Sequence, residues 1–173
     1  MPVRVPSRRT LSIGVAAILV ALVGGFFWWW SHPALFLDVN ASEWLEAQPL
    51  AHAAFSSSVT FPPQSGGEVI TLNSATAHFS ENSAQAHATF VVCRGLIGGA
   101  GADLSKVCTS VRQLPTTFRY LPESKDSVVI VITPTRAGRA TVDAVTLNYD
   151  EGGSALWRQG SQTIAVSVGT TAR

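Results

Sequence analysis

Charge is scarce in this chain. Asp, Glu, Lys and Arg make up 13% of its 173 residues, about half of the ~25% that is usual in globular proteins. Three of the twelve Lys and Arg residues precede residue 11, which leaves nine basic residues against eleven acidic ones in the remainder. Without an excess of positive charge there is no field to hold a polyanion. Nucleic acid is therefore excluded as an expected partner.

Sequence motifs of catalysis are also missing. The chain contains no G-x-S-x-G, no H-E-x-x-H and no calcium-loop pattern. Four glycines lie between residues 95 and 101, but the lysine that a phosphate-binding loop requires does not follow them. The sequence thus predicts neither an enzyme nor a bound cofactor.

A single long apolar run occupies residues 11–30, LSIGVAAILVALVGGFFWWW, and carries no charge. As a helix rising about 1.5 Å per residue it spans roughly 30 Å, the thickness of the hydrocarbon core of a bilayer. Three arginines precede the run, and no basic residue follows it before Arg94. The positive-inside rule then places residues 1–10 in the cytoplasm and the rest of the chain outside. The sequence predicts a single-pass plasma-membrane protein with a lipid-embedded signal anchor at 11–30.

The apolar run ends in Trp28, Trp29 and Trp30. Indole rings favour the membrane–water interface, so these residues are expected at the outer interface. A cleaved signal peptide is the alternative, since it also has a basic start and an apolar region. That region is normally only ~7–15 residues long and ends at a small-x-small site. The candidate site here, Ala51-His52-Ala53, lies well beyond the run, which favours an uncleaved anchor.

Residues 31–67 are expected to connect the anchor to an outer domain. The segment 38–46, DVNASEWLE, has the capping residues and early glutamates that are typical of a short helix. Serine, proline and glycine, which favour turns and loops, are then frequent as far as Gly67. Only residues 59–61 are expected to form a short strand in this part of the chain. The sequence predicts a juxtamembrane segment and a stalk here.

Residues 68–173 have an apolar period of two, which indicates strands. Seven strands separated by turn residues predict an all-β sandwich or barrel. The run Val128–Ile132 is apolar throughout, which is typical of a central strand. The predicted strands are Glu68–Phe79, Ala86–Cys93, Val107–Gln113, Thr116–Leu121, Ser127–Thr133, Arg139–Tyr149 and Ser161–Val168.

Two turns separate the last three of these strands, at residues 134–138 and 150–153. With these turns, the segment ITPTRAGRATVDAVTLNYDEGGSALWRQGSQTIAVSV resembles the closing strands of immunoglobulin-like modules in bacterial surface proteins of the actinobacterial type. The resemblance covers roughly a quarter of the chain. It implies an immunoglobulin-like β-sandwich of about seven strands and implies no activity, because that architecture hosts unrelated functions.

The chain has two cysteines, Cys93 and Cys108, and the predicted topology places both outside the cytoplasm. Disulfides persist there, so one bridge is expected. Closing the glycine-rich loop between them removes roughly 3 kcal/mol of unfolded-state entropy. The loop either staples the domain or presents Leu96 and Ile97 as a binding surface.

A sortase-like transpeptidase is a rival interpretation of the same cysteines. Such enzymes are anchored β-barrels that use Cys, His and Arg, and here the nucleophile would be Cys108. Its partners would be His78 or His87 together with Arg112 or Arg119. The residues before Cys108 lack the Thr-Leu-x-Thr-Cys context of that family, and a disulfide offers Cys108 another role.

The histidines suggest a metal site if residues 80–85 form a hairpin loop. That register pairs Phe79 with Ala86 and sets His78 directly opposite His87, with Cβ atoms ~5 Å apart. The two imidazoles would then suit one copper or zinc ion. No third ligand is evident, and two histidines on a solvated face are also an ordinary polar surface.

These observations favour a non-enzymatic interaction module that is held at the outer membrane surface and binds another envelope protein or a cell-wall component. The alternative is a metal-handling or thiol-exchanging accessory factor that uses His78 and His87 or the cysteine pair.

Overall fold

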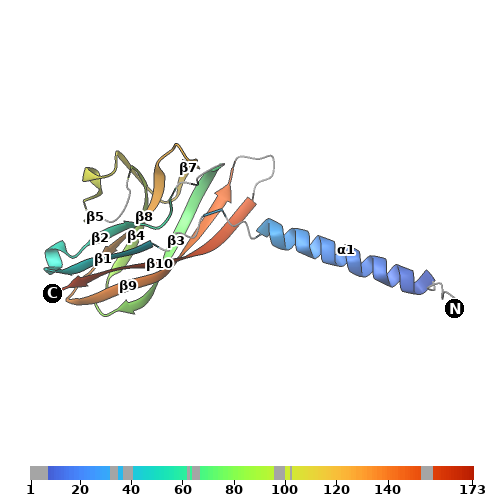
Figure 1. The fold of residues 1–173 in the computed structure, drawn as a ribbon, viewed down its shortest axis with the longest axis horizontal. Helices are drawn as coiled ribbons and strands as arrows, with labels where there is room; N and C mark the ends of the chain where they lie inside the picture. The colour runs from blue at the N-terminus through green and yellow to red at the C-terminus, as the bar shows by residue number, and fades with distance from the viewer. Residues whose placement is uncertain are drawn as a thin grey trace.

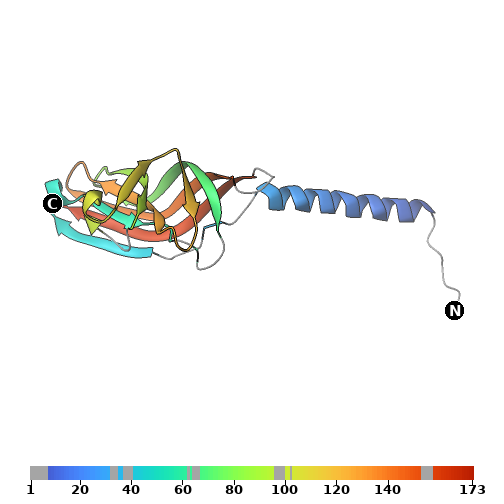
Figure 2. The ribbon, with the colours of Figure 1, turned by 90° about the horizontal axis from the view of Figure 1, so that it is seen from above.

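The computed structural model describes residues 8–31, 35–36, 41–61, 63, 67–95, 100–101, 103–152 and 158–173. In the described residues, one long α-helix precedes a body of strands (Figure 1). The helix α1 (Arg8–Ser31) extends away from that body, and its side chains are described from residue 17 onward. Figure 2 shows the same separation from a second direction.

The described strands form two five-stranded sheets, so the chain folds as an all-β sandwich as predicted. Sheet A has the order β1-β10-β9-β3-β7, and sheet B has the order β5-β2-β8-β4-β6. The strands of sheet A are β1 (Ala41–Gln48), β3 (Glu68–Asn82), β7 (Thr116–Tyr120), β9 (Gly138–Glu151) and β10 (Arg158–Ala172). Those of sheet B are β2 (Phe55–Ser58), β4 (His87–Arg94), β5 (Ala100–Gly101), β6 (Ser110–Gln113) and β8 (Asp126–Thr133). Two short 3-10 helices connect strands along the chain. They are η1 (Leu50–His52), between β1 and β2, and η2 (Leu104–Lys106), between β5 and β6.

The alternation of apolar residues explains which face each strand buries. In β7, Phe118 and Tyr120 are buried while Thr117 and Arg119 are exposed. The apolar run of β8 lies between β2 and β4, in the middle of sheet B. The prediction of a central strand there is confirmed.

Residues 41–46 of the segment predicted as a short helix belong instead to strand β1, which pairs in parallel with β10, and residues 38–40 lie outside the described residues. Its ladder starts with Ala41 opposite Val166. Beyond its end, the N–H of Arg173 donates to the carbonyl of Gln48 at 2.9 Å. The helix prediction was wrong because capping residues and early glutamates are weak local preferences, which tertiary pairing overrides. Since β2 also belongs to a sheet, the sandwich begins before residue 68.

The core lies between the two sheets, and residues ahead of β1 contribute to it. Phe36 is buried, and its ring centroid lies 5.1 Å from that of Tyr120 and 5.0 Å from that of Tyr149. The side-chain oxygen of Gln162 accepts from the backbone N–H groups of Leu35 and Phe36 at 2.9 and 2.8 Å. This segment is therefore fixed to sheet A rather than loosely tethered.

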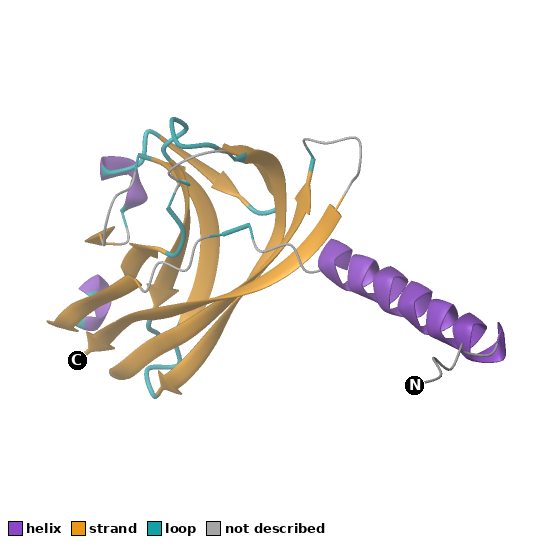
Figure 3. Cartoon of the chain, turned by 45° about the vertical axis from the view of Figure 1, so that its right-hand side comes forward, coloured by secondary structure: helices purple, strands orange, loops and turns teal. Residues whose placement is uncertain are grey.

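The connection between β3 and β4 differs from the predicted hairpin. β3 pairs with β7 and β9, while β4 pairs with β6 and β8, so the two strands lie in different sheets. Residues 83–86 form a crossover between the layers of the sandwich. Figure 3 shows the curved strands that these layers contain.

Candidate functional site

The two cysteines form the predicted disulfide. The sulfur atoms of Cys93 and Cys108 are 2.05 Å apart, and the two Cα atoms are 5.5 Å apart. Cys93 lies on β4, and Cys108 follows η2, so the bond returns the intervening loop to sheet B. Both sulfurs belong to a small apolar cluster with Val91 and Val129 on the face of sheet B turned away from the main core. Leu104 of η2 also packs against this cluster, so the described end of the loop is fixed to that face.

Disulfide formation bears directly on two of the alternatives. Bonded to Cys93, Cys108 has no thiol with which to act as a sortase-like nucleophile. Thiol–disulfide exchange also requires access of a thiolate to a sulfur. Cys93 is 0% exposed and Cys108 is 8% exposed. The geometry therefore favours a stapling role for this bond.

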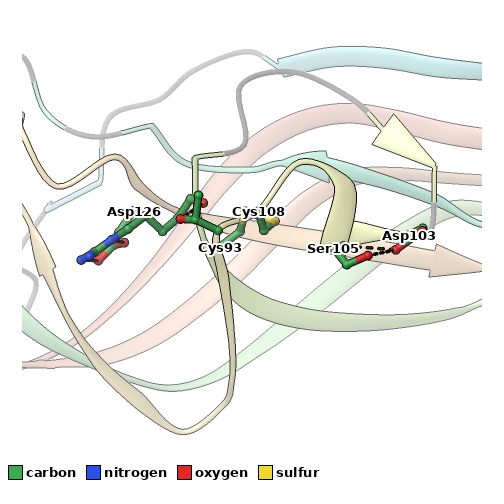
Figure 4. Close-up of a disulfide and its surroundings, with 7 residues drawn as sticks. Cys93, Asp103, Ser105, Cys108 and Asp126 are labelled. Atoms are coloured by element: carbon green, nitrogen blue, oxygen red, sulfur yellow. Dashed lines mark hydrogen bonds and ion pairs between the residues drawn. A yellow bond between two sulfur atoms is a disulfide. The ribbon is translucent and has the colours of Figure 1, made fainter.

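A buried carboxylate lies on β8, one position along the β4–β8 ladder from Cys93. Asp126 is only 1% exposed, and it accepts from Nε of Arg94 at 2.9 Å and from Nη2 of Arg112 at 2.8 Å. The hydrogen bond from Arg94 to Asp126, and next the attraction between their charges, raise the pKa of that guanidinium above its ordinary value. Asp126 lies opposite Arg94, the residue that follows Cys93 on β4, and Figure 4 includes it in the same view as the disulfide. This ion cluster joins β4, β6 and β8, so it braces the sheet.

The disulfide loop carries a capped turn. The side chain of Asp103 accepts from the backbone N–H of Ser105 at 3.2 Å and also from the Ser105 hydroxyl. That hydroxyl bond is the main reason why the pKa of Asp103 is lowered, with Lys106 adding a smaller effect. Leu96 and Ile97, the predicted binding surface of the loop, lie outside the described residues.

His78 and His87 do not form the predicted cross-strand pair. His78 lies opposite Ala144 of β9, and its Nε2 is 2.8 Å from the Thr146 hydroxyl on the outer face of sheet A. His87 lies opposite Thr133 of β8 in the other sheet. The register was wrong because a hairpin loop and a crossover of similar length have the same strand period in sequence. Among the described residues, no group of three or more His, Cys, Asp and Glu side chains is placed to hold a metal ion.

An open polar cleft lies at the end of the sandwich opposite α1. Its volume is about 450 Å³, and we call it the distal cleft. The residues that line it are Asn82, Gln85, Ala86, His87 and Thr135. They come from the end of β3, the crossover, the start of β4 and the turn after β8. This end is distal because Asn82 pairs with Ala140 near the C-terminal end of β10, whereas α1 meets the sandwich near the start of β10 (Figure 1).

Hydrogen bonds lock the crossover to the turn between β8 and β9. The carbonyl of Ala84 accepts from the N–H groups of Thr135 and Arg136, each at 3.2 Å. The Thr135 hydroxyl donates to the carbonyl of Gln85 at 2.9 Å. Gly138 permits this approach, because its φ is +145° and a Cβ there would lie 2.8 Å from the backbone nitrogen of Ala84. The two loops therefore form one fixed unit.

Two polar side chains of the distal cleft remain available to a ligand. The amide of Asn82 is occupied, since its oxygen accepts from Ala86 N–H at 2.7 Å and its nitrogen donates to Ala86 O at 3.1 Å. Within the described part of the chain, the Gln85 amide and the His87 ring have no hydrogen-bond partner. Sequence reasoning considered His87 as a metal ligand and missed Gln85. Gln85 gave no signal in the sequence beyond being a polar residue in an expected loop.

The three tryptophans lie at the C-terminal end of α1, where Trp28 is 66% exposed and Trp29 is 55% exposed. In the fully described part of the chain, which includes α1 only from residue 17, no helix is both long enough and apolar enough to cross a membrane.

Comparison with known proteins places the chain in no family: no protein-family description matches it, and no curated protein matches it either.

Proposed function

We propose that this chain is a membrane-anchored, extracytoplasmic interaction module that binds another envelope protein or a cell-wall component. The observation that carries the proposal is the exposure of apolar side chains around α1. Val20 is 73% exposed, Leu22 is 65% exposed and Phe27 is 65% exposed. The helix extends away from the sandwich in both views (Figures 1 and 2), so the sandwich does not cover these side chains.

Lipid is the environment that suits such a helix. Each large apolar side chain gains roughly 1.5–3 kcal/mol when it leaves water. A helix that is apolar on all sides is typical of a membrane span or of a buried core. The sequence from residue 11 to residue 30 is uncharged throughout, so the apolar composition of α1 extends toward its N-terminus. Its flanking arginines favour a cytoplasmic N-terminus and an outer sandwich.

The disulfide is consistent with this orientation. Such bonds persist outside the cytoplasm, where thiols are not kept reduced. The bond between Cys93 and Cys108 therefore fits a sandwich on the outer side of a plasma membrane.

The strand order supports the immunoglobulin-like assignment. Consecutive strands repeatedly change sheets, as from β3 to β4 and from β8 to β9. Such alternation is a property of Greek-key sandwiches. The fold implies no catalysis, and an anchored module confines its encounters to a thin layer, so a weak interface can be effective there.

Topology and membrane extraction test the proposal. A reporter that is active only outside the cytoplasm, fused after Arg173, should be active, and the protein should stay in membranes after carbonate washing. The double change Leu22→Lys and Val23→Lys should release it, because a lysine near the centre of a spanning helix costs about 2.5–3.5 kcal/mol.

The matched control places two lysines on exposed positions of sheet A, Thr76→Lys and Ser161→Lys. This variant should remain in the membrane fraction. Reporter activity confined to the cytosol, or wild-type protein that washes freely from membranes, would rule the proposal out.

A further inference from the structure

We infer that the distal cleft binds a neutral oligosaccharide through the side chains of Gln85 and His87. The inference rests on the proposed function and specifies its ligand, since it selects a glycan as the cell-wall component. The distal cleft has a volume of about 450 Å³ and is open to solvent, so a ligand can reach its lining side chains directly.

The lining of the distal cleft decides the chemical class of the ligand. Among the described residues, no Asp, Glu, Lys or Arg belongs to the lining, so the lining side chains carry no group that compensates a charged ligand. The one aliphatic residue, Ala86, is itself only 6% exposed. The cleft also lacks the aromatic and arginine anchors that dominate protein–protein interfaces. A ligand held here must bind by uncharged hydrogen bonds.

Amide and imidazole groups suit the hydroxyls of a sugar. The Gln85 amide offers both donors and an acceptor, and a neutral imidazole offers one of each. A sugar hydroxyl likewise donates and accepts. Because both side chains lack partners within the described residues, binding them breaks no internal hydrogen bond.

The backbone around the cleft is fixed in advance. Gln85 has a φ of +47°, a left-handed conformation that is uncommon for residues other than glycine. Strained conformations of this kind persist where the surroundings hold them, and they concentrate at binding sites. Here the bonds from Thr135 and Arg136 to the crossover hold the conformation. The location of the cleft also suits a ligand-binding role, since its lining residue Asn82 pairs with Ala140, near the end of β10 that lies away from α1.

The test measures binding of a panel of neutral tetrasaccharides, namely chitotetraose, cellotetraose and mannotetraose. The protein is the full chain in lipid nanodiscs, and amide chemical shifts with calorimetry give the affinity. At least one of these probes should bind saturably and shift the resonances of residues 82–87 and 135. His87→Ala and Gln85→Asn should each weaken binding about three- to tenfold, as expected for one lost hydrogen bond. Asparagine at position 85 tolerates the left-handed backbone but has a shorter reach.

His78→Ala is the matched control, because His78 is an exposed histidine on the outer face of sheet A, away from the cleft. Its affinity should equal that of the wild type. A galacturonate tetramer and acetyl-tetraalanine amide provide the charged and the peptide comparisons, and neither should shift the cleft.

Four results would overturn the inference. These are no binding by any neutral tetrasaccharide, unchanged affinity in both cleft variants, a peptide that shifts the cleft while the sugars do not, and preferred binding of the galacturonate. Binding in nanodiscs does not depend on orientation in the cell. Absence of sugar binding therefore counts against the sugar site alone. Reporter activity confined to the cytosol counts against the proposed function alone.

Discussion

Asp126 is the residue on which the electrostatics of sheet B depend. It is buried, and it forms ion pairs with two arginines, Arg94 and Arg112. Asp126→Asn should lower the free energy of unfolding by about 2–3 kcal/mol. This is less than the ~3–5 kcal/mol for breaking a fully buried pair, because 54% of Arg94 and 33% of Arg112 remain exposed to water. Urea unfolding of the fragment 35–173, with and without Asp126→Asn, measures this change in the free energy of unfolding.

Asp143→Asn serves as the comparison for that change. Asp143 is an exposed residue of β9, and its substitution should alter stability by no more than about 0.5 kcal/mol. Equal midpoints for the two variants would show that the ion cluster contributes nothing to stability.

At the residue scale, sequence reasoning succeeded with the cysteines and failed with the histidines. A chain with two cysteines allows a single intramolecular pairing, so the predicted bond needed no knowledge of the fold. The relation of His78 to His87 depends on whether residues 83–86 turn back within one sheet or cross to the other. Local periodicity is the same in both cases, so the sequence alone could not distinguish them.

At the scale of single elements, the disulfide that closes the loop is the feature whose removal should be the most informative. Cys93→Ala with Cys108→Ala should lower the free energy of unfolding by about 3 kcal/mol, because the unfolded chain regains the entropy of an open loop. The sequence separation of the two cysteines is 15 residues. Thermal and urea unfolding under non-reducing conditions measure the change.

A reductant gives an independent check of that prediction. Wild-type protein in reductant should approach the stability of the double variant, while the variant itself should not respond. If the variant were as stable as the oxidised wild type, the bond would not staple the domain.

Strand β1 marks the limit of element prediction. Its sequence, ASEWLEAQ, shows no strict alternation of apolar and polar residues, so it gave no strand signal. What makes it a strand is the unsatisfied edge of β10, more than a hundred residues away in the chain. A parallel edge strand of this kind is fixed by its partner, and no local preference encodes it. The long strands β3, β9 and β10, by contrast, show their period clearly and were placed within a few residues.

For the whole molecule, the position of Phe36 predicts where a stable fragment must begin. A fragment of residues 35–173 should be more stable than one of residues 47–173 by at least about 3–5 kcal/mol, the usual effect of removing a buried phenylalanine. The shorter fragment also loses most of β1. Circular dichroism should report strands in the longer fragment, and urea midpoints should separate the two.

The substitution Phe36→Ala within the longer fragment isolates the contribution of the ring. It should reproduce a large part of the difference, because the contacts with Tyr120 and Tyr149 disappear. Equal stability of all three proteins would mean that this aromatic cluster does not support the core.

The sequence predicted the class of the fold correctly, since strand period and turn residues are local properties. It underestimated the number of strands, expecting about seven where the described residues form ten. The distal cleft was not predicted at all, because Gln85, His87 and Thr135 meet only through the crossover and the turn after β8. The membrane anchor stays a prediction, which the proposed extraction experiment tests.

Parallel pairing of β1 with β10 has a mechanical consequence. The chain enters β1 from the side of α1 and runs toward the far end, alongside a strand of the same direction. Tension between the helix and a ligand at the tip would first load the attachment of Leu35 and Phe36 to sheet A, and would then pull β1 lengthwise along β10. All the hydrogen bonds of that ladder would then share the load, instead of opening one after another. If the proposed anchor and ligand hold, this geometry would let the sandwich resist a pull between them.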